Sequence, residues 1–129
     1  MEISFSNFLF VGIGGAIGAI CRFYLGIISK NIFQFEFPFT TLIINIFGCT
    51  VLGLVVKYFS LFNTSNEALK IIITIGFLGG FTTFSAFSME AFSLLSNEKY
   101  LFAVVYVFGS VLLSILGFTF GYFLISKNI

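Results

Sequence analysis

Residues 71–89 read IIITIGFLGGFTTFSAFSM, an uncharged stretch with a glycine pair and a threonine pair at its centre. Its length suits a helix that crosses a bilayer, which needs about 20 mostly apolar residues. Paired glycines followed by β-branched threonines are poor helix formers, so we expect the helix to unwind at this centre. Irregular backbone is tolerated at membrane depth only where it is buried in protein or lines a cavity. The stretch therefore predicts a membrane-spanning helix that is broken midway.

Three further uncharged stretches predict three more spans, at residues 8–21, 37–56 and 100–125, with the first continuing past Arg22 toward Ile28. Of the 129 residues, 59% are hydrophobic and 9% are charged, whereas about a quarter of the residues in ordinary soluble domains are charged. We expect one all-α transmembrane domain over residues 1–129. The expected helices cover approximately residues 5–29, 38–59, 66–95 and 99–126.

The connections between these stretches are short and leave no room for a soluble domain. Pro38 suits the first turn of the second helix, where its missing N–H costs nothing. Residues 64–67 have capping-box spacing, so the third helix is expected to start near Ser65. The N-terminus lacks the positive region and the cleavage site of a secretory signal, so the first span is expected to remain in the mature protein. Cys21 and Cys49 fall inside spans and are expected to act as small hydrophobes rather than as a disulfide.

The basic residues are divided evenly between the two sides of the membrane. With four spans, the side of the two termini holds Lys57, Lys70 and Lys127, and the other side holds Arg22, Lys30 and Lys99. Loops rich in Lys and Arg normally stay in the cytoplasm, so this balance leaves the orientation almost undetermined. We expect copies to insert both ways and to pair as antiparallel homodimers. A weak bias that fixes one orientation is the alternative on charge counting alone.

Polar side chains inside the spans are few and share helix faces. Thr41 and Asn45 stand four residues apart on the second helix, and the fourth helix repeats this spacing at Tyr106, Ser110 and Ser114. Hydrogen bonds between helices would account for such groups, and for the serines alone we favour that role. The amide of Asn45 offers two donors that need an acceptor in the membrane, so we expect it to contact a solute.

Helix three also carries an aromatic pair just past the expected break, since Phe84 and Phe87 lie three residues apart and share a face. Ring edges are positive and can contact an anion, although in a chain with 21 Phe the usual role of such a pair is core or lipid packing. Carbonyls freed at a helix break bind cations in transporters. Glycines four residues apart, which permit close helix packing, occur at positions 14 and 18, 76 and 80, and 117 and 121.

Two charged residues lie toward the ends of spans, Arg22 and Glu90. Ionisable groups inside a membrane are candidates for function. Arg22 is placed to draw anions into a vestibule, and Glu90 is expected to snorkel or to form an ion pair. The sequence has no catalytic triad, Cys/His metal cluster or phosphate loop, and it lacks histidine, the commonest general base. We do not expect an enzyme.

Over essentially its whole length the chain resembles the Fluc (CrcB) family of fluoride channels. The resemblance rests on Gly14–Ala19 leading to Arg22, on Asn45 followed by Gly48, and on the segment Gly76–Phe87. It implies an antiparallel, dual-topology homodimer that passively exports fluoride from the cytoplasm and so relieves fluoride toxicity. It also implies a structural sodium ion at the centre of the dimer.

The resemblance further implies which residues serve the two ions. The sodium ligands would be the backbone carbonyls of Gly79 and Thr82 from both subunits. The fluoride pathway would be lined by Asn45, Phe84, Phe87, Ser85, Tyr106, Ser110 and Thr41, with Arg22 near its entrance. Many family members have threonine where this chain has Ala86, so one hydroxyl of the polar track is missing.

Two other classes of protein remain as alternatives. Proton-coupled small multidrug exporters are similar in having four short helices and dual topology, but they use a carboxylate in the first span, where this chain has Gly14. An assembly subunit without transport would leave the break in helix three without a purpose.

Overall fold

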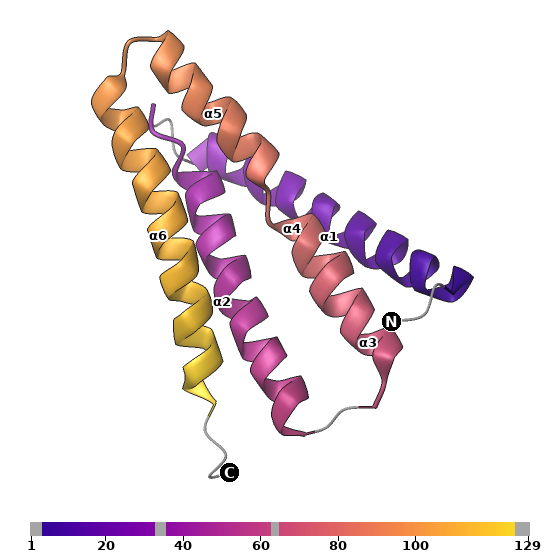
Figure 1. The fold of residues 1–129 in the computed structure, drawn as a ribbon. Coiled ribbons are helices and arrows are strands. Elements are labelled where there is room, and N and C mark those ends of the chain that lie inside the picture. The colour runs from indigo at the N-terminus through magenta and orange to yellow at the C-terminus, as the bar shows by residue number, and fades with distance from the viewer. Residues whose placement is uncertain (1–3, 33–35, 63–64, 126–129) are drawn as a thin grey trace.

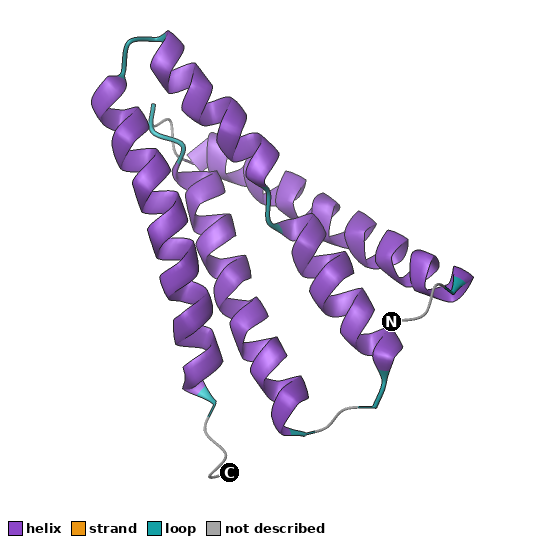
Figure 2. Ribbon diagram, viewed as in Figure 1, coloured by secondary structure: helices purple, strands orange, loops and turns teal. Residues whose placement is uncertain are grey.

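The computed structural model describes residues 4–32, 36–62 and 65–125, and these residues are helical apart from short turns and connections (Figure 1, Figure 2). The elements are α1 (Phe5–Ile32), α2 (Phe39–Leu61), α3 (Glu67–Lys70), η1 (Ile71–Leu78), α4 (Gly79–Phe81), α5 (Phe84–Ser96) and α6 (Tyr100–Leu124). By length and apolar composition they form four candidate spans, at residues 5–30, 39–61, 67–96 and 100–124. The prediction of an all-helical chain with four transmembrane helices is confirmed.

The third span consists of four consecutive segments. The π-helical segment η1 has backbone hydrogen bonds that reach five residues back instead of four, and the short α4 follows it. Thr82 (φ −79°, ψ 153°) and Thr83 (φ −149°, ψ 123°) then adopt extended backbone, which suits β-branched residues. Unwinding was expected at the glycine pair as well, but Gly79 and Gly80 remain helical. That part of the prediction is wrong because Gly80 serves packing: a Cβ there would lie 2.5 Å from the carbonyl oxygen of Gly15.

The start of the third span differs slightly from the prediction. The helix was expected to begin near Ser65, but α3 begins at Glu67 and Asn66 is its N-cap. The Asn66 side chain accepts a hydrogen bond from the Leu69 N–H at 3.0 Å. Asparagine is as good an N-cap as serine, so it can take this position. Thr64, the first residue of the predicted capping box, lies outside the described residues.

Four other predictions concern Pro38, the end of the first helix, the two cysteines and Lys127. Pro38 occupies the position immediately before α2 rather than its first turn. The first helix continues to Ile32, beyond the expected end at residue 29. Cys21 and Cys49 are free thiols of intermediate burial. Lys127, which entered the charge comparison, lies outside the described residues.

The described chain is built from two closely packed helix pairs. One pair is α2 with α6, which run side by side (Figure 1). A Cβ at Gly121 would overlap the carbonyl oxygen of Thr50, and a Cβ at Gly53 would overlap that of Phe118. These helices can therefore approach each other this closely only because the contact positions lack side chains.

The other pair is α1 with the segments η1 and α4 of the third span. A Cβ at Gly14 would overlap the carbonyl oxygen of Ile72, and a Cβ at Gly18 would overlap that of Phe77. The prediction that the spaced glycines permit close helix packing is confirmed at these positions.

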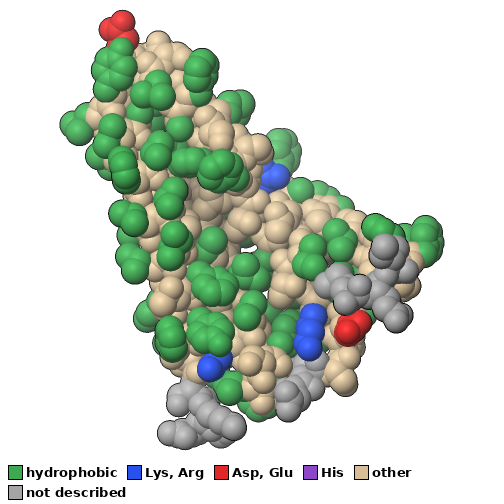
Figure 3. All heavy atoms as spheres, viewed as in Figure 1, with side chains coloured by type: hydrophobic (Ala, Val, Ile, Leu, Met, Phe, Trp, Pro, Cys, Tyr) green, Lys and Arg blue, Asp and Glu red, His purple; other side chains and the backbone are tan. Residues whose placement is uncertain are grey.

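A small core forms where α5 meets α6. Tyr106 is fully buried at its centre, and Phe87, Ala91, Leu94 and Ala103 are buried with it. Elsewhere large apolar side chains are exposed, and Figure 3 shows them spread over the visible face with only a few charged side chains between them. Such a surface suits helices that contact lipid or another protein copy rather than water.

The contact between α2 and α6 can be tested with one methyl group. Gly121→Ala is expected to push these helices apart and to lower the free energy of unfolding by about 1–3 kcal/mol, because overpacking is costly. Gly109→Ala in the same helix is the matched control, since a Cβ there has nothing within 4 Å. Thermal denaturation of the detergent-purified proteins, followed by size-exclusion chromatography, provides the comparison. Equal melting temperatures for the two variants would contradict the predicted overlap.

Candidate functional site

The break in the third span is held by one side chain of α2. The Nδ2 of Asn45 donates a hydrogen bond to the carbonyl of Thr83 at 2.9 Å, and the Thr83 N–H donates one to the Oδ1 of Asn45 at 2.8 Å. In a continuous α-helix that N–H would bond to the carbonyl of Gly79. Asn45 therefore satisfies the interrupted backbone and releases the Gly79 carbonyl from its usual helical partner.

The helix resumes immediately after the break because Thr83 also caps it. The Oγ1 of Thr83 accepts a hydrogen bond from the Ala86 N–H at 3.2 Å, which is the usual N-cap arrangement. Thr83 is buried, and its Oγ1 lies 3.2 Å from the Oγ of Ser85. Thr83 was not predicted as a site residue, although its place in the threonine pair was the available signal.

Two further contacts occupy carbonyls before the break. The Thr82 N–H and its Oγ1 both bond to the carbonyl of Leu78, at 3.0 and 2.9 Å. The Nε of Arg22 donates to the carbonyl of Gly80 at 3.3 Å. Gly79, by contrast, is exposed on the surface of the protomer. Of the two predicted sodium ligands, Gly79 is the first residue of α4 and Thr82 is its C-cap, where the helix stops.

A cavity of about 430 Å³, here called the break cavity, opens beside this junction. It brings together seven predicted or candidate residues, namely Asn45, Gly79, Thr82, Phe84, Phe87, Ser110 and Ser114. Among the described residues that line it there is no charged side chain. Its polar groups are therefore an amide, hydroxyls and backbone groups, beside phenyl rings.

Three of these lining residues differ in exposure. The Oγ of Ser110 is buried and has no hydrogen-bond partner among the described residues. Phe87 is buried, whereas Phe84 is 74% exposed although it lines the cavity. The ring centroids of Phe84 and Phe87 are 5.1 Å apart. A buried hydroxyl without a partner is uncommon in proteins, and its position makes it available to a ligand.

The half-buried carboxylate of the site comes from α5. Glu90 accepts hydrogen bonds from the Oγ1 of Thr41 at 2.8 Å and from the hydroxyl of Tyr106 at 2.6 Å. Thr41 is 8% exposed and Tyr106 is fully buried. The expectation that Glu90 snorkels or forms an ion pair is wrong for the described residues, because hydroxyls of α2 and α6 bind it instead. Glu90 follows Phe87 by three residues in the sequence, and this spacing predicts that the two side chains share one face of the helix.

A second cavity, of about 490 Å³, also borders Thr83 and is here called the entrance cavity. Its lining includes Arg22, Lys30, Thr41, Thr83, Ala86 and Glu90. Thr83 lines both cavities, whereas Asn45 lines only the break cavity among the described residues. Ser85 lines neither cavity, and it is exposed.

Comparison with known proteins identifies relatives of this chain. The family described as CrcB-like protein, Camphor Resistance (CrcB), matches residues 9–122. The fluoride-specific ion channel FluC 2 of Clostridium acetobutylicum is 40% identical over 92% of this chain and 97% of its own length. FluC 1 of Bacillus cereus is 37% identical over 95% of this chain and 92% of its own. FluC of Chloroflexus aurantiacus is 42% identical over 82% of this chain and 84% of its own.

These relatives are named as ion channels, which confirms the expectation that the chain is not an enzyme. Four apolar helices of transmembrane length, in a family of bacterial membrane channels, make it a multi-pass protein of the bacterial plasma membrane. With the family match spanning most of the chain and relatives above 30% identity along nearly its whole length, the chain belongs to the CrcB family of membrane channels.

Proposed function

We propose that residues 1–129 act as one transmembrane domain that forms a passive, fluoride-selective channel. The relatives named fluoride-specific ion channels support this function, at 37% to 42% identity. The observation in this chain that carries the proposal is the break cavity, where the buried Ser110 hydroxyl has no partner among the described residues and the described lining residues carry no charge.

Fluoride is small and holds its hydration water tightly, so a selective path must replace that water. The break cavity offers hydroxyl donors, the second Nδ2 proton of Asn45 and the ring of Phe87. Aromatic ring edges carry partial positive charge and can contact an anion. Neutral partners also bind weakly enough for the ion to leave, as conduction requires.

The proposed route joins the two cavities through the junction of Asn45 with Thr83. Arg22 lies in the lining of the entrance cavity and attracts anions there. The remaining pathway residues are Thr41, Asn45, Phe84, Ser85, Phe87, Tyr106 and Ser110. Because Thr41 and Tyr106 both donate to Glu90, their hydroxyls reach the anion only when they are shared with or released from that carboxylate.

The direction of transport follows from electrostatics. The interior of a bacterial cell is electrically negative, and moving one charge through 100 mV changes its energy by about 2.3 kcal/mol. A passive anion path therefore lets fluoride leave the cytoplasm without an energy source. We propose that this export relieves fluoride toxicity.

We further propose that two copies pair in an antiparallel, dual-topology homodimer around a structural sodium ion. The chemistry of the junction fits this ion, because the carbonyl of the exposed Gly79 has lost the Thr83 N–H as a partner. Carbonyl oxygens at half-helix ends suit sodium. The carbonyls of Gly79 and Thr82 from both subunits would bind it, at the depth where the third span breaks. A bound cation would also favour an anion nearby through its field.

The alternative of a proton-coupled multidrug exporter has no support from the first span. Such an exporter needs a carboxylate there, but Gly14 packs so closely that even a Cβ would overlap the carbonyl oxygen of Ile72. A carboxylate would not fit at this position without separating α1 from η1.

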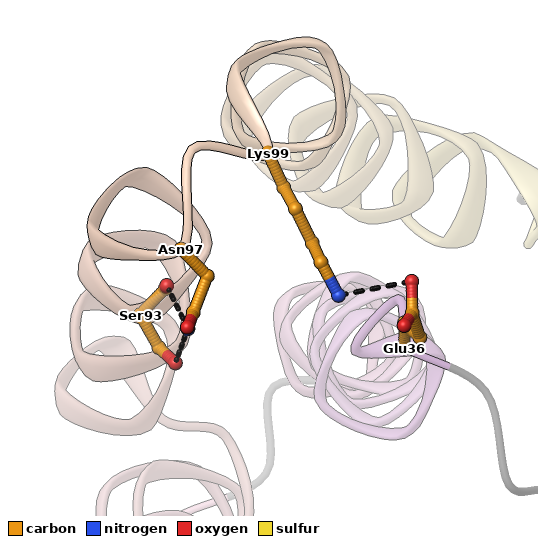
Figure 4. Close-up of polar contacts among 4 residues, drawn as sticks. All are labelled: Glu36, Ser93, Asn97 and Lys99. Carbon is orange, nitrogen blue, oxygen red and sulfur yellow. Dashed lines mark hydrogen bonds and ion pairs between the residues drawn. The ribbon is translucent and has the colours of Figure 1, made fainter.

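Reconstituted liposomes test the proposed function. The wild-type protein is expected to release loaded fluoride passively and electrogenically, as measured with a fluoride electrode in the presence of a potassium ionophore. Asn45→Asp is expected to abolish the flux, because a carboxylate would repel both the anion and the Thr83 carbonyl that now accepts from Nδ2. Asn97→Asp is the matched control, since this exposed asparagine bonds only within its own helix end, to Ser93 (Figure 4). Wild-type liposomes that retain fluoride would refute the channel.

Dual topology is tested with reporter tags at the C-terminus. Tags that are active only in the cytoplasm and tags that are active only outside it should both give signal, because the basic residues barely bias insertion. Adding two lysines after Ile125 is expected to shift the population toward one orientation. Signal from one side alone in the wild-type protein would contradict the antiparallel dimer.

The sodium site is tested by elemental analysis of the purified dimer after exchange into sodium-free buffer. We expect about one sodium ion for every two chains, because a single ion would lie on the two-fold axis of the dimer. The same preparation, assayed for fluoride flux, links the ion to the function. Active dimer without sodium would remove the ion from the proposal.

A further inference from the structure

An ion pair joins two turns at the same end of the molecule. The Nζ of Lys99 lies 2.9 Å from the Oε2 of Glu36, which approaches from the segment before α2 (Figure 4). Lys99 immediately precedes α6, and its backbone N–H bonds to the carbonyl of Leu94 at 2.9 Å. The preceding residue, Glu98, has a φ of 59°, so the turn is sharply folded. The lysine is thus presented from a well-defined turn.

The pair lies at the rim of the entrance cavity. Glu36 is part of the lining of that cavity, together with the cations Arg22 and Lys30 and the half-buried carboxylate of Glu90. These four side chains carry two positive and two negative charges, which cancel. Lys99 adds one positive charge directly against Glu36, and Glu98 of the same turn adds one negative charge, so these six side chains carry no net charge.

The ion pair between Lys99 and Glu36 contributes little to the free energy of folding. The side chains of Lys99 and Glu36 are 34% and 69% exposed. Exposed ion pairs typically contribute only about 0–1 kcal/mol to stability. Their charges nevertheless act at a distance, because a rim charge changes the local concentration and the arrival rate of a charged ligand.

We propose that Lys99 sets the rate at which fluoride enters the pathway, by neutralising Glu36 at the rim of the entrance cavity. This inference rests on the proposed function, since it requires an anionic permeant. Without Lys99, the unpaired Glu36 carboxylate repels the anion at the rim of the entrance cavity. With Lys99 in place, Arg22 and Lys30 attract the anion past a neutral rim.

The proposal predicts opposite effects for the two partners. Lys99→Gln is expected to lower the initial fluoride flux and Glu36→Gln to raise it, each by roughly two- to threefold at low salt and subsaturating fluoride. The charge-swapped double variant, Glu36→Lys with Lys99→Glu, keeps the total charge and should conduct like the wild type. Both differences should vanish near 1 M of an impermeant salt, where the Debye length falls to about 3 Å.

Liposomes of neutral lipid give the measurement, so that headgroup charge does not mask the effect. Glu67→Gln is the matched control, because it removes one exposed carboxylate in α3 that does not belong to the lining of the entrance cavity. Size-exclusion profiles verify that all variants fold and assemble equally. These variants leave the break cavity untouched.

Two results would overturn the role of Lys99. Single variants that conduct like the wild type at low salt would show that the rim charge has no effect. If Lys99→Gln and Glu36→Gln both reduce the flux, and do so equally at low and high salt, the ion pair acts by holding the two turns together and not by its charge. In either case the wild-type protein still conducts, whereas a wild-type protein that retains fluoride refutes the proposed function itself.

Discussion

An interrupted helix inside a membrane leaves backbone N–H and C=O groups without hydrogen-bond partners, because no water is present to bind them. The packing of the helices in this protein follows from how these groups are hydrogen-bonded. Asn45 supplies both a donor and an acceptor to the backbone of Thr83, at 2.9 and 2.8 Å. An unpaired backbone group in hydrocarbon costs several kcal/mol, so the break persists only while α2 holds this side chain against it. Asn45 thereby fixes where α5 begins, and with it the positions of Phe87 and Glu90.

The packing of the rest of the protomer serves this junction. Close glycine contacts hold α2 to α6 and α1 to η1 and α4, so the two halves of the broken span are supported from different sides. Arg22 reaches from α1 to the carbonyl of Gly80, while Thr41 and Tyr106 reach from α2 and α6 to Glu90. Each half of the third span therefore has polar contacts of its own, and both cavities border Thr83, where the halves meet.

The charged side chains are separated from the break cavity. Within the described lining, the break cavity holds neutral donors only, whereas the charged side chains gather around the entrance cavity and its rim. A permanent cation beside a small anion would bind it too tightly for conduction, while cations at an entrance raise its local concentration. The proposed channel thus uses formal charge to attract the ion and dipoles to pass it on.

The sequence by itself determined the class of the protein, because four long uncharged stretches can be buried only in a membrane. It also predicted an interruption within residues 76–87, a segment in which Thr82 and Thr83 have extended backbone. It named Asn45, Phe87 and Ser110 as residues of one site, and the structure brings them to one cavity. Only the tertiary structure decided that the threonines rather than the glycines unwind, since Gly80 is needed against Gly15 of α1. It likewise decided that Glu90 accepts two hydroxyls and that Lys99 pairs with Glu36. Those partners come from helices distant in sequence, and helical periodicity gives the face of a residue but not the element that packs against it.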